Sequence, residues 1–363
     1  MKIHIIGTLR FTHPQIKINL LAEKEMQKNQ KCFLIAEIGQ AHDGSLGILH
    51  SYIDALASIG IDAIKFQTHI AEAESSIHEP FRVKFSYEDD TRIDYWNRMA
   101  FSKTQWKEIK QHCDEVGLEF MSSPFSQAAV DLLEEIGVKR YKIGSGEVTN
   151  FLILEKIAKT GKPIIISSGM SSFEELDKSV ELIQSFGNDL SIVQCTTAYP
   201  TPYDRLGLNV MTELKAKYPF AKVGLSEHTG EIYAGIAAAA LGAELLEFHA
   251  VFDKRMFGPD AKSSMEIDQI AEMVNGVRAI ESALNNPIDK NDLSKYTELK
   301  KIFEKSLAVN KDLPQGHIIT FDDLEAKKPA NLGIKASSFK EVIGKKLNCA
   351  LMKWDFLTKD DLT

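Results

Sequence analysis

The stretch KVGLSEHTGEIYAGIAAAALGAELLEFHA, residues 222–250, decides the fold. It begins with an apolar run at 223–225, continues with small apolar residues at helical spacing, and returns to an apolar run at 243–248. This order of strand, helix and strand predicts one βαβ unit of a parallel sheet. His228 follows the first strand and His249 the second, so two neighbouring strands would present both imidazoles at one edge of the sheet.

Such a pair of histidines suits a particular kind of metal site. Two neutral imidazoles that converge, with coordination positions left open, can bind a divalent metal ion that also holds a substrate. Glu247 or a water molecule could complete the ligand set. Two unrelated histidines, one packed and one solvated, are the alternative interpretation.

The same unit recurs along the chain. Eight apolar strands are predicted, with approximate starts at residues 33, 62, 118, 138, 163, 190, 222 and 243, and a helical pattern follows each. Eight such units in about 250 residues match the size of a (β/α)8 barrel. A doubly wound open sheet is the alternative, but GQAHDGSLG after the first strand lacks the GxGxxG order of a phosphate-binding turn. We therefore predict an α/β fold built on a TIM barrel.

The pattern also predicts the domain organisation. Residues 1–31 are interpreted as an N-terminal extension without assigned chemistry, and residues 32–285 as the barrel. A polar linker at 286–300 precedes a small second domain of short strands and turns at 301–363. The segment 68–102 is too long for an ordinary βα loop and rich in charged and aromatic residues, which is typical of a functional loop.

Composition excludes several classes of function. The 363-residue chain is 44% hydrophobic and carries a net charge of −8 with no block of lysines or arginines, which argues against a nucleic-acid or anionic-membrane partner. The four cysteines are scattered without CxxC spacing, so neither a zinc knuckle nor a disulfide framework is indicated. No signal peptide and no long apolar run is found, and we expect a cytoplasmic protein.

Polar and ionisable residues follow the predicted strands where a barrel enzyme keeps its site. They are Glu37, Lys65, Gln67, Ser122, Ser123, Lys142, Ser145, Glu147, Ser167, Ser168, Thr196, Thr197, Ser226, His228, Glu247 and His249. Lys65 and Lys142 each end an apolar strand, with little expected nearby to neutralise them, so an anionic ligand is the natural partner. Hydroxyls of Ser145, Ser167 and Ser226 could donate to phosphate oxygens. Solvated lysines, or a Schiff-base aldolase using either lysine, are the alternatives.

Eight ordered motifs resemble one known family. They are AEIGQAHDGSL, IKFQTHIAEAESS, SSPFS, YKIGSGE, SSGM, QCTTAYPTP, GLSEHT and GPD, and they are similar to motifs of the N-acetylneuraminate (sialic acid) synthase family. The resemblance runs from about residue 33 to the end, and 301–363 resembles the antifreeze-like SAF domain, a β-clip fold. It implies condensation of phosphoenolpyruvate with an open-chain N-acetylated amino sugar, N-acetylmannosamine first, to a sialic-acid-type 2-keto acid and phosphate. It also implies manganese or magnesium as cofactor.

The resemblance assigns roles to individual residues. His228 and His249 match the metal ligands, and the phosphoenolpyruvate contacts are matched by Lys65, Lys142, Ser145, Ser167 and Ser226. Glu37 and Gln67 match positions near the metal and the sugar, Tyr199 and Asp260 match sugar contacts, and Ser123 and Thr197 match small polar contacts. Glu147 is predicted to bind substrate from its place after a strand. Glu37 is the candidate to position or deprotonate the attacking water.

Three departures from the family pattern concern recognition. Ala41 replaces a frequent asparagine, and Phe248 a frequent polar or basic residue. Lys328, in KKPA, stands where the family has an arginine that reaches the sugar's acetamido group in the partner subunit's site, which implies a domain-swapped homodimer. A lysine keeps the charge but lacks the planar fork, so sugar recognition there would be weaker or altered.

Three alternatives stay open at this point. The loop THIAEAESS resembles sialic acid synthases proper more than the pseudaminic branch, but a legionaminic-type synthase using a 2,4-diacetamido-6-deoxy hexose is possible. Related barrels that condense phosphoenolpyruvate with phosphorylated sugars lack the SAF domain and need more basic residues. A retired, non-catalytic sugar-binding barrel would normally have lost some of the ionisable residues, and none is missing.

Overall fold

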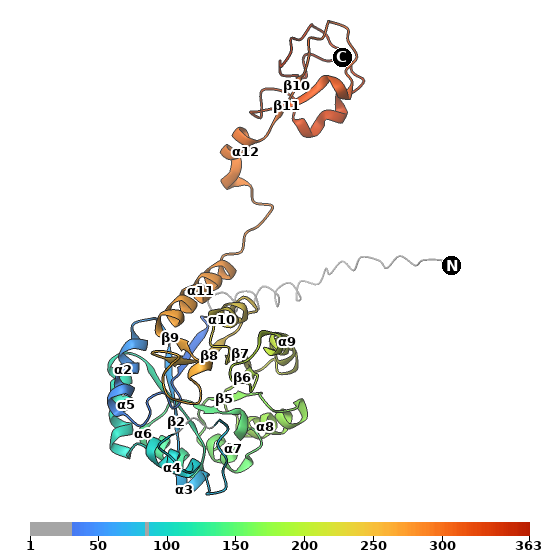
Figure 1. Cartoon of the computed structure of the whole chain (residues 1–363). Helices are drawn as coiled ribbons and strands as arrows, with labels where there is room; N and C mark the ends of the chain where they lie inside the picture. Colours follow the sequence, from blue (N-terminus) through green and yellow to red (C-terminus); the bar gives the residue numbers. More distant parts are fainter. Residues whose placement is uncertain (1–30, 84–86) are drawn as a thin grey trace. The chain divides into compact units, whose positions relative to one another are not determined.

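A computed structural model describes residues 31–83 and 87–363 of the chain (Figure 1). The predicted N-terminal extension, except for Lys31, lies outside the described residues. The chain divides into two compact units, of which the first ends at Asn286 and the second is Pro287–Thr363. Each unit is described by itself.

Eight parallel strands form the barrel of the first unit. They are β1 (Phe33–Glu37), β2 (Ala63–Thr68), β3 (Glu119–Pro124), β4 (Tyr141–Ile143), β5 (Ile164–Ser167), β6 (Leu190–Cys195), β7 (Lys222–Glu227) and β8 (Leu245–Val251). The sheet order is β3-β2-β1-β8-β7-β6-β5-β4, and β3 packs beside β4 to close the circle. The short β9 (Met265–Glu266) pairs with the end of β8. The predicted TIM barrel is confirmed.

Helices between consecutive strands surround the barrel, and another follows β9 (Figure 1). They are α2 (Leu46–Ala57), α5 (Lys103–Glu115), α6 (Gln127–Ile136), α7 (Phe151–Ala158), α8 (Phe173–Ser185), α9 (Leu208–Lys217), α10 (Ile232–Ala240) and α11 (Ile267–Asn285). Local sequence sets their ends: Ser102 and Gln105 form the capping box of α5, and Gly137 ends α6 in the left-handed conformation at φ +84°. The strand predicted to start near residue 138 is observed at Tyr141–Ile143, and Ser145–Glu147 turns into a 3-10 helix just after it.

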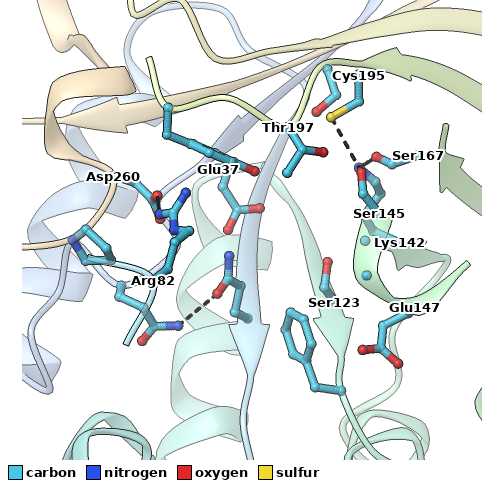
Figure 2. A pocket seen from close by; sticks show the side chains of 18 of the residues that line it. Glu37, Arg82, Ser123, Lys142, Ser145, Glu147, Ser167, Cys195, Thr197 and Asp260 are labelled. Carbon is cyan, nitrogen blue, oxygen red and sulfur yellow. Dashed lines mark hydrogen bonds and ion pairs between the residues drawn. The ribbon is translucent and has the colours of Figure 1, made fainter. Parts of the chain in front are cut away.

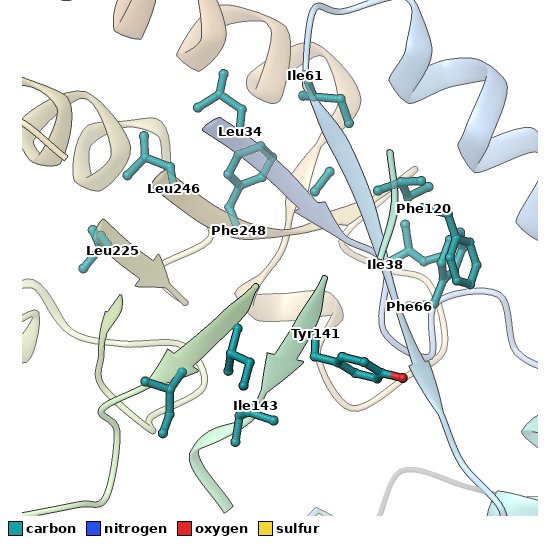
Figure 3. Close-up of a cluster of buried hydrophobic side chains, with 14 of the residues drawn as sticks. Leu34, Ile38, Ile61, Phe66, Phe120, Tyr141, Ile143, Leu225, Leu246 and Phe248 are labelled. Carbon is teal, nitrogen blue, oxygen red and sulfur yellow. The ribbon is translucent and has the colours of Figure 1, made fainter. Parts of the chain in front are cut away.

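The two-residue period of the strands separates the core from the site. On β1, Leu34 and Ala36 face the helices, whereas Ile35 belongs to a small apolar cluster inside the barrel. That inner cluster consists of Ile35, Ala63, Met121, Ile165, Val193 and Leu245. Two residues further along their strands, Glu37 and Lys65 point the same way but lie beyond the apolar layer. Figure 3 shows the larger core between strands and helices. The inner apolar layer therefore closes the bottom of the barrel, and the polar residues lie directly above it.

The predicted functional loop, 68–102, contains two short helices among its described residues. They are α3 (Ala71–Glu74) and α4 (Arg92–Met99). The insert packs through its own apolar cluster, in which Tyr95, Trp96 and Met99 are buried. The 68–102 insert does not follow the alternation of strands and helices, and packing of its aromatic side chains holds it in position.

The second unit is small and built mainly from turns. Its regular elements are α12 (Thr297–Phe303), β10 (Ser306–Val309) and β11 (Leu324–Lys327), and the two strands pair antiparallel. The helix α12 begins inside the range predicted as linker. The core of this unit is formed by Leu307, Val309, Leu313, Ile319, Val342, Leu347, Leu351 and Leu357. In the described parts of both units, none of the helices has the length and apolar character needed to cross a membrane.

Candidate active site

A cavity of about 470 Å³ opens at the C-terminal ends of the barrel strands. Its lining includes all the site residues predicted in the barrel: Glu37, Lys65, Gln67, Ser123, Lys142, Ser145, Glu147, Ser167, Thr197, Tyr199, Ser226, His228, His249 and Asp260 (Figure 2). Lys328 belongs to the second unit, where its Nζ lies 4.9 Å from the centre of the Phe303 ring. The structure thus brings these residues together, whereas Ser122, Ser168 and Thr196, which also follow predicted strands, do not line the cavity.

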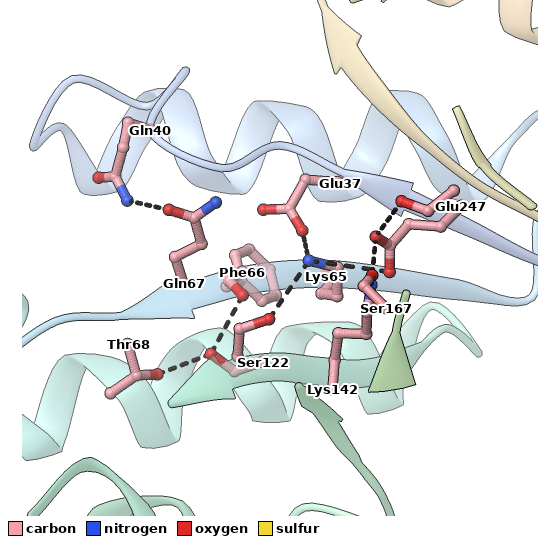
Figure 4. A network of polar contacts seen from close by, with 12 residues as sticks. Glu37, Gln40, Lys65, Phe66, Gln67, Thr68, Ser122, Lys142, Ser167 and Glu247 are labelled. Carbon is pink, nitrogen blue, oxygen red and sulfur yellow. Dashed lines mark hydrogen bonds and ion pairs between the residues drawn. The ribbon is translucent and has the colours of Figure 1, made fainter. Parts of the chain in front are cut away.

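Both strand-end lysines are buried and paired with carboxylates (Figure 4). Lys142 Nζ donates to Glu247 Oε1 at 2.7 Å and to Ser167 Oγ at 2.8 Å. Lys65 forms an ion pair with Glu37, which the strand register places directly opposite, and lies 3.8 Å from Glu247 Oε2. The expectation that little would neutralise these lysines is therefore wrong, because strand pairing places Glu37 beside Lys65 and barrel closure brings Glu247 to Lys142.

Glu247 is the residue that joins the two lysines. Its Oε1 also accepts a hydrogen bond from Ser226 at 2.8 Å. Burial would raise the pKa of Glu247, but Lys142 and Lys65 together lower it to about 2, so the carboxylate is ionised. Among the described residues, Glu247 does not form a three-residue metal-binding group with the two histidines. The sequence located Glu247 at a strand end but gave no sign of this role.

Burial also affects the protonation of Lys65. It lowers the pKa of Lys65 to about 8, although the neighbouring Glu247 acts in the opposite direction. Lys65 therefore keeps its positive charge at neutral pH and begins to lose it in mildly alkaline solution. The affinity for an anionic ligand that contacts Lys65 therefore depends on pH in the same range.

The two histidines are neighbours at the open end of the barrel. Their ring centres lie 5.2 Å apart. His228 Nδ1 lies 3.1 Å from the backbone oxygen of Thr196, so Nδ1 carries the proton and Nε2 keeps its lone pair. Burial lowers the pKa of His228 to about 3 and also lowers the pKa of His249, so both imidazoles are neutral at pH 7.

These imidazoles fit a metal ion that takes only some of its ligands from the protein. Neutral nitrogen donors with one tautomer fixed by a backbone carbonyl are what metal coordination requires. Within 31–83 and 87–363, no cluster of three or more His, Cys, Asp or Glu side chains could hold a metal by itself. His228 and His249 would therefore supply two ligands and leave the other positions to water or substrate.

Hydroxyls line the lysine side of the cavity. Ser167 accepts from Lys142, and Ser123 Oγ accepts from Lys65 Nζ at 3.4 Å. Ser145 Oγ lies within 3.5 Å of the Cys195 thiol, with Thr197 close by in Figure 2. These small polar groups surround two cations, which is the composition of an anion site.

Glu147 stands on the same side, just after β4. Its Oε2 accepts a hydrogen bond from Asn150 Nδ2 at 2.7 Å. Partial burial raises the pKa of Glu147 despite this hydrogen bond. Its carboxyl group can accept hydrogen bonds from a ligand's hydroxyl groups.

The other side of the cavity carries the predicted sugar contacts. Gln67 Oε1 accepts a hydrogen bond from Gln40 Nε2 at 3.1 Å. The Tyr199 ring lies 4.3 Å from the His228 ring, centre to centre. Arg82 Nη2 donates to Asp260 Oδ1 at 2.5 Å. This half of the cavity thus presents donors, acceptors and an aromatic face, as a polyhydroxylated ligand needs.

Several lining residues from the 68–102 insert and its surroundings were missed by the sequence argument. His69 lies between the Trp96 and Phe125 rings at 3.6 and 4.4 Å, contacts Glu74 through Nδ1, and has Nε2 at 3.1 Å from Gln67 Oε1. Further lining residues are Gln40, Glu79, Arg82, Arg92, Met170 and Cys195. The sequence signals for the insert were its length, its composition and the motif THIAEAESS at its start, none of which assigned a role to these residues.

One departure from the family pattern has no effect on the cavity. Phe248 is fully buried and belongs to the core between strands and helices. It alternates along β8 with Glu247 and His249, which line the cavity. Its side chain therefore serves packing rather than ligand contact.

Comparisons with known proteins identify the family. The NeuB family model matches residues 52–289, and the SAF domain model matches residues 304–363. The chain is 34% identical to the N,N'-diacetyllegionaminic acid synthase of Campylobacter jejuni, covering 87% of this chain and 96% of that protein. It is also 34% identical to the N-acetylneuraminate-9-phosphate synthase of Homo sapiens, covering 87% and 88%. A pseudaminic acid synthase of Campylobacter jejuni is 32% identical, covering 92% and 97%.

Solved structures are similar as well. The N-acetylneuraminic acid (sialic acid) synthetase of Leptospira borgpetersenii matches with a TM-score of 0.65 and 27% identity, covering 74% of this chain and 90% of that one. The spore coat polysaccharide biosynthesis protein spsE of Bacillus subtilis matches with a TM-score of 0.61 and 25% identity, covering 92% and 95%.

Proposed function

The chain belongs to the NeuB family and carries a SAF domain, and from this premise we propose that it is a nonulosonic acid synthase. It condenses phosphoenolpyruvate with an open-chain N-acetylated amino sugar, N-acetylmannosamine first, and releases phosphate. The observation that carries this proposal is the pair of buried lysines, ringed by serine hydroxyls, beside two neutral histidines in one cavity.

In the proposed reaction, each side of the cavity takes one substrate. Lys65, Lys142 and Ser167 hold the phosphate and carboxylate of phosphoenolpyruvate and orient its enol carbon. His228 and His249 would hold a divalent ion, manganese or magnesium, which supplies polarisation of the sugar aldehyde. The enol carbon forms the new bond to the aldehyde carbon. The electron-poor carbon left behind takes up water, and one water proton passes by way of Glu37 to the former aldehyde oxygen, which becomes a hydroxyl. The second water proton leaves with phosphate as the C–O bond to the bridging oxygen breaks and the ketone forms.

Glu37 is the residue that we assign to the water. Its Oε1 is buried and has no hydrogen-bond partner in the described part of the chain. The strand register places it beside His249 on one side and Lys65 on the other. A buried carboxylate oxygen in that position can accept a proton from the attacking water.

A legionaminic-type synthase is the second candidate. The Campylobacter jejuni relative with that product name is as similar to this chain as the human relative is. The mechanism would be unchanged, and the sugar would be a 2,4-diacetamido-6-deoxy hexose. The cytoplasmic location and the domain-swapped homodimer, with Lys328 reaching a partner's site, stay predictions from sequence.

The test is phosphate release from phosphoenolpyruvate labelled with ¹⁸O in its bridging oxygen. We expect release only when manganese and one sugar are present, N-acetylmannosamine or the diacetamido hexose, with the label recovered in phosphate. Release with only the diacetamido hexose would select the legionaminic-type activity. No release with either sugar would contradict the synthase and favour the sugar-binding barrel, and label retained in the 2-keto acid would contradict C–O cleavage.

The pH dependence of phosphoenolpyruvate binding provides a second prediction. Because the pKa of Lys65 is about 8, its positive charge is present below that pH and lost as the pH rises through it. We expect the KM for phosphoenolpyruvate to rise about tenfold per pH unit above that value. Initial rates measured from about pH 7 to about pH 9.5 would show the rise, with the KM for the sugar as the internal control. A flat profile for phosphoenolpyruvate would exclude Lys65 as a charge contact.

A further inference from the structure

Arg82 reaches the cavity from the 68–102 insert and contacts two predicted sugar-binding residues. Its Nη2 donates to Asp260 Oδ1 at 2.5 Å, and its guanidinium carbon lies 4.1 Å from the centre of the Tyr199 ring. Figure 2 shows Arg82 and Asp260 across the cavity from Ser145 and Lys142. Arg82 therefore lies on the side that phosphoenolpyruvate would leave to the second substrate.

Arg82 is also the accessible cation of that side. Its side chain is 41% exposed, whereas the side chains of Lys65 and Lys142, deeper in the cavity, are 5% and 2% exposed. The neighbouring Arg92 is covered by the Trp96 ring, 4.1 Å from its guanidinium carbon. A ligand that enters the cavity can therefore reach the guanidinium of Arg82 directly.

The guanidinium of Arg82 has N–H groups that can donate to a ligand in addition to Asp260. An arginine carries five N–H groups and no acceptor. Asp260 is its hydrogen-bond and ion-pair partner among the described residues, and the Tyr199 ring covers one of its faces. Stacking and ion pairing fix the plane of the guanidinium before a ligand arrives, so less conformational entropy is lost on binding.

Together, Arg82 and Asp260 present a donor beside an acceptor. Ionised Asp260 can only accept hydrogen bonds and Arg82 can only donate them. An N-acyl group has the complementary pair, because its amide nitrogen donates and its carbonyl oxygen only accepts. Hydroxyl groups can adapt to either partner, whereas the carbonyl oxygen requires a donor such as Arg82.

We propose that Arg82 is a specificity-determining residue whose guanidinium donates to the N-acyl carbonyl oxygen of the amino sugar. Asp260 and Tyr199 position it, and Asp260 receives the amide N–H. This inference rests on the proposed synthase function and names the chemical group by which the enzyme selects its second substrate.

The variant Arg82→Gln tests this role. For the sugar that supports phosphate release, we expect its KM to rise about 10- to 100-fold, the loss that follows removal of a charge-assisted hydrogen bond. The KM for phosphoenolpyruvate should change by less than about twofold. The preference for the N-acyl sugar over its analogue without the 2-acetamido group should fall by the same factor. Arg82→Lys should recover part of the loss.

Arg98→Gln is the matched control. Arg98 lies on α4 of the same insert and pairs with Asp89 at 2.8 Å and Asp43 at 2.7 Å, but it does not line the cavity. It should leave the KM for the sugar unchanged. The role of Arg82 would be overturned by an unchanged KM in Arg82→Gln, by an equal loss with both sugar analogues, or by the same effect in Arg98→Gln. Wild-type enzyme without phosphate release would contradict the proposed function itself.

Discussion

Replacing Lys142 by methionine should lower kcat/KM for phosphoenolpyruvate by about a thousandfold and destabilise the protein by about 3 kcal/mol. Activity falls because the variant lacks the ammonium group proposed to hold the substrate anion. Stability falls because Lys142 Nζ lies 2.7 Å from buried Glu247, which would keep only Ser226 at 2.8 Å and the more distant Lys65 at 3.8 Å. Steady-state kinetics and urea unfolding measure the two effects separately.

A second substitution distinguishes the two causes. In the double variant Lys142→Met with Glu247→Gln, no unpaired carboxylate is left, so most of the lost stability should return. Activity should not return, because the cation is still missing. Lys156→Met is the control: Lys156 forms a partly exposed ion pair with Asp131 at 2.6 Å, and its loss should change neither quantity appreciably. Unchanged phosphoenolpyruvate kinetics in Lys142→Met would refute the assignment.

Replacing Glu37 by glutamine should reduce kcat by about 10²- to 10⁴-fold, the usual contribution of a general base. Glutamine has nearly the same shape but cannot take a proton from water. Its KM for phosphoenolpyruvate should change much less, because Lys65 and Lys142 are retained. Single-turnover phosphate release at about pH 7, below the pKa of Lys65, isolates the chemical step.

Glu227 offers a matched control for this variant. It is buried like Glu37, at the end of β7, but accepts hydrogen bonds from Thr229 and does not line the cavity. Burial raises the pKa of Glu227 to about 7, so about half of the Glu227 side chains are already neutral at that pH and Glu227→Gln removes only part of a charge. Glu227→Gln should leave kcat nearly unchanged. A kcat within tenfold of wild type in Glu37→Gln would show that Glu37 is not the base.

The sequence predicted those features that depend on local patterns. Strand alternation and helix caps such as Ser102 with Gln105 are encoded over a few residues, so the barrel could be recognised. Strand-end residues such as Lys65 and His249 were found because a parallel barrel gathers them at one end. The site was predictable to the extent that the fold itself brings its residues together.

Contacts between distant side chains could not be predicted in the same way. Lys142 and Glu247 lie on β4 and β8, which are not neighbours in the sheet, and they meet only across the closed barrel. Arg82 meets Asp260 across 178 residues of sequence because the insert is fixed by aromatic packing, in which Trp96 is buried. No periodic pattern encodes either contact, since each depends on the packed structure as a whole.

Glu247 forms ion pairs with both Lys142 and Lys65, and this arrangement has a consequence for turnover. The protein supplies its own anion to the cations that would hold phosphoenolpyruvate, so an arriving substrate gains only the difference between two sets of ion pairs. Affinity is thereby moderated. In the proposed reaction, the same carboxylate would compensate both lysines as the phosphate product leaves, and this competition would lower the barrier to product release.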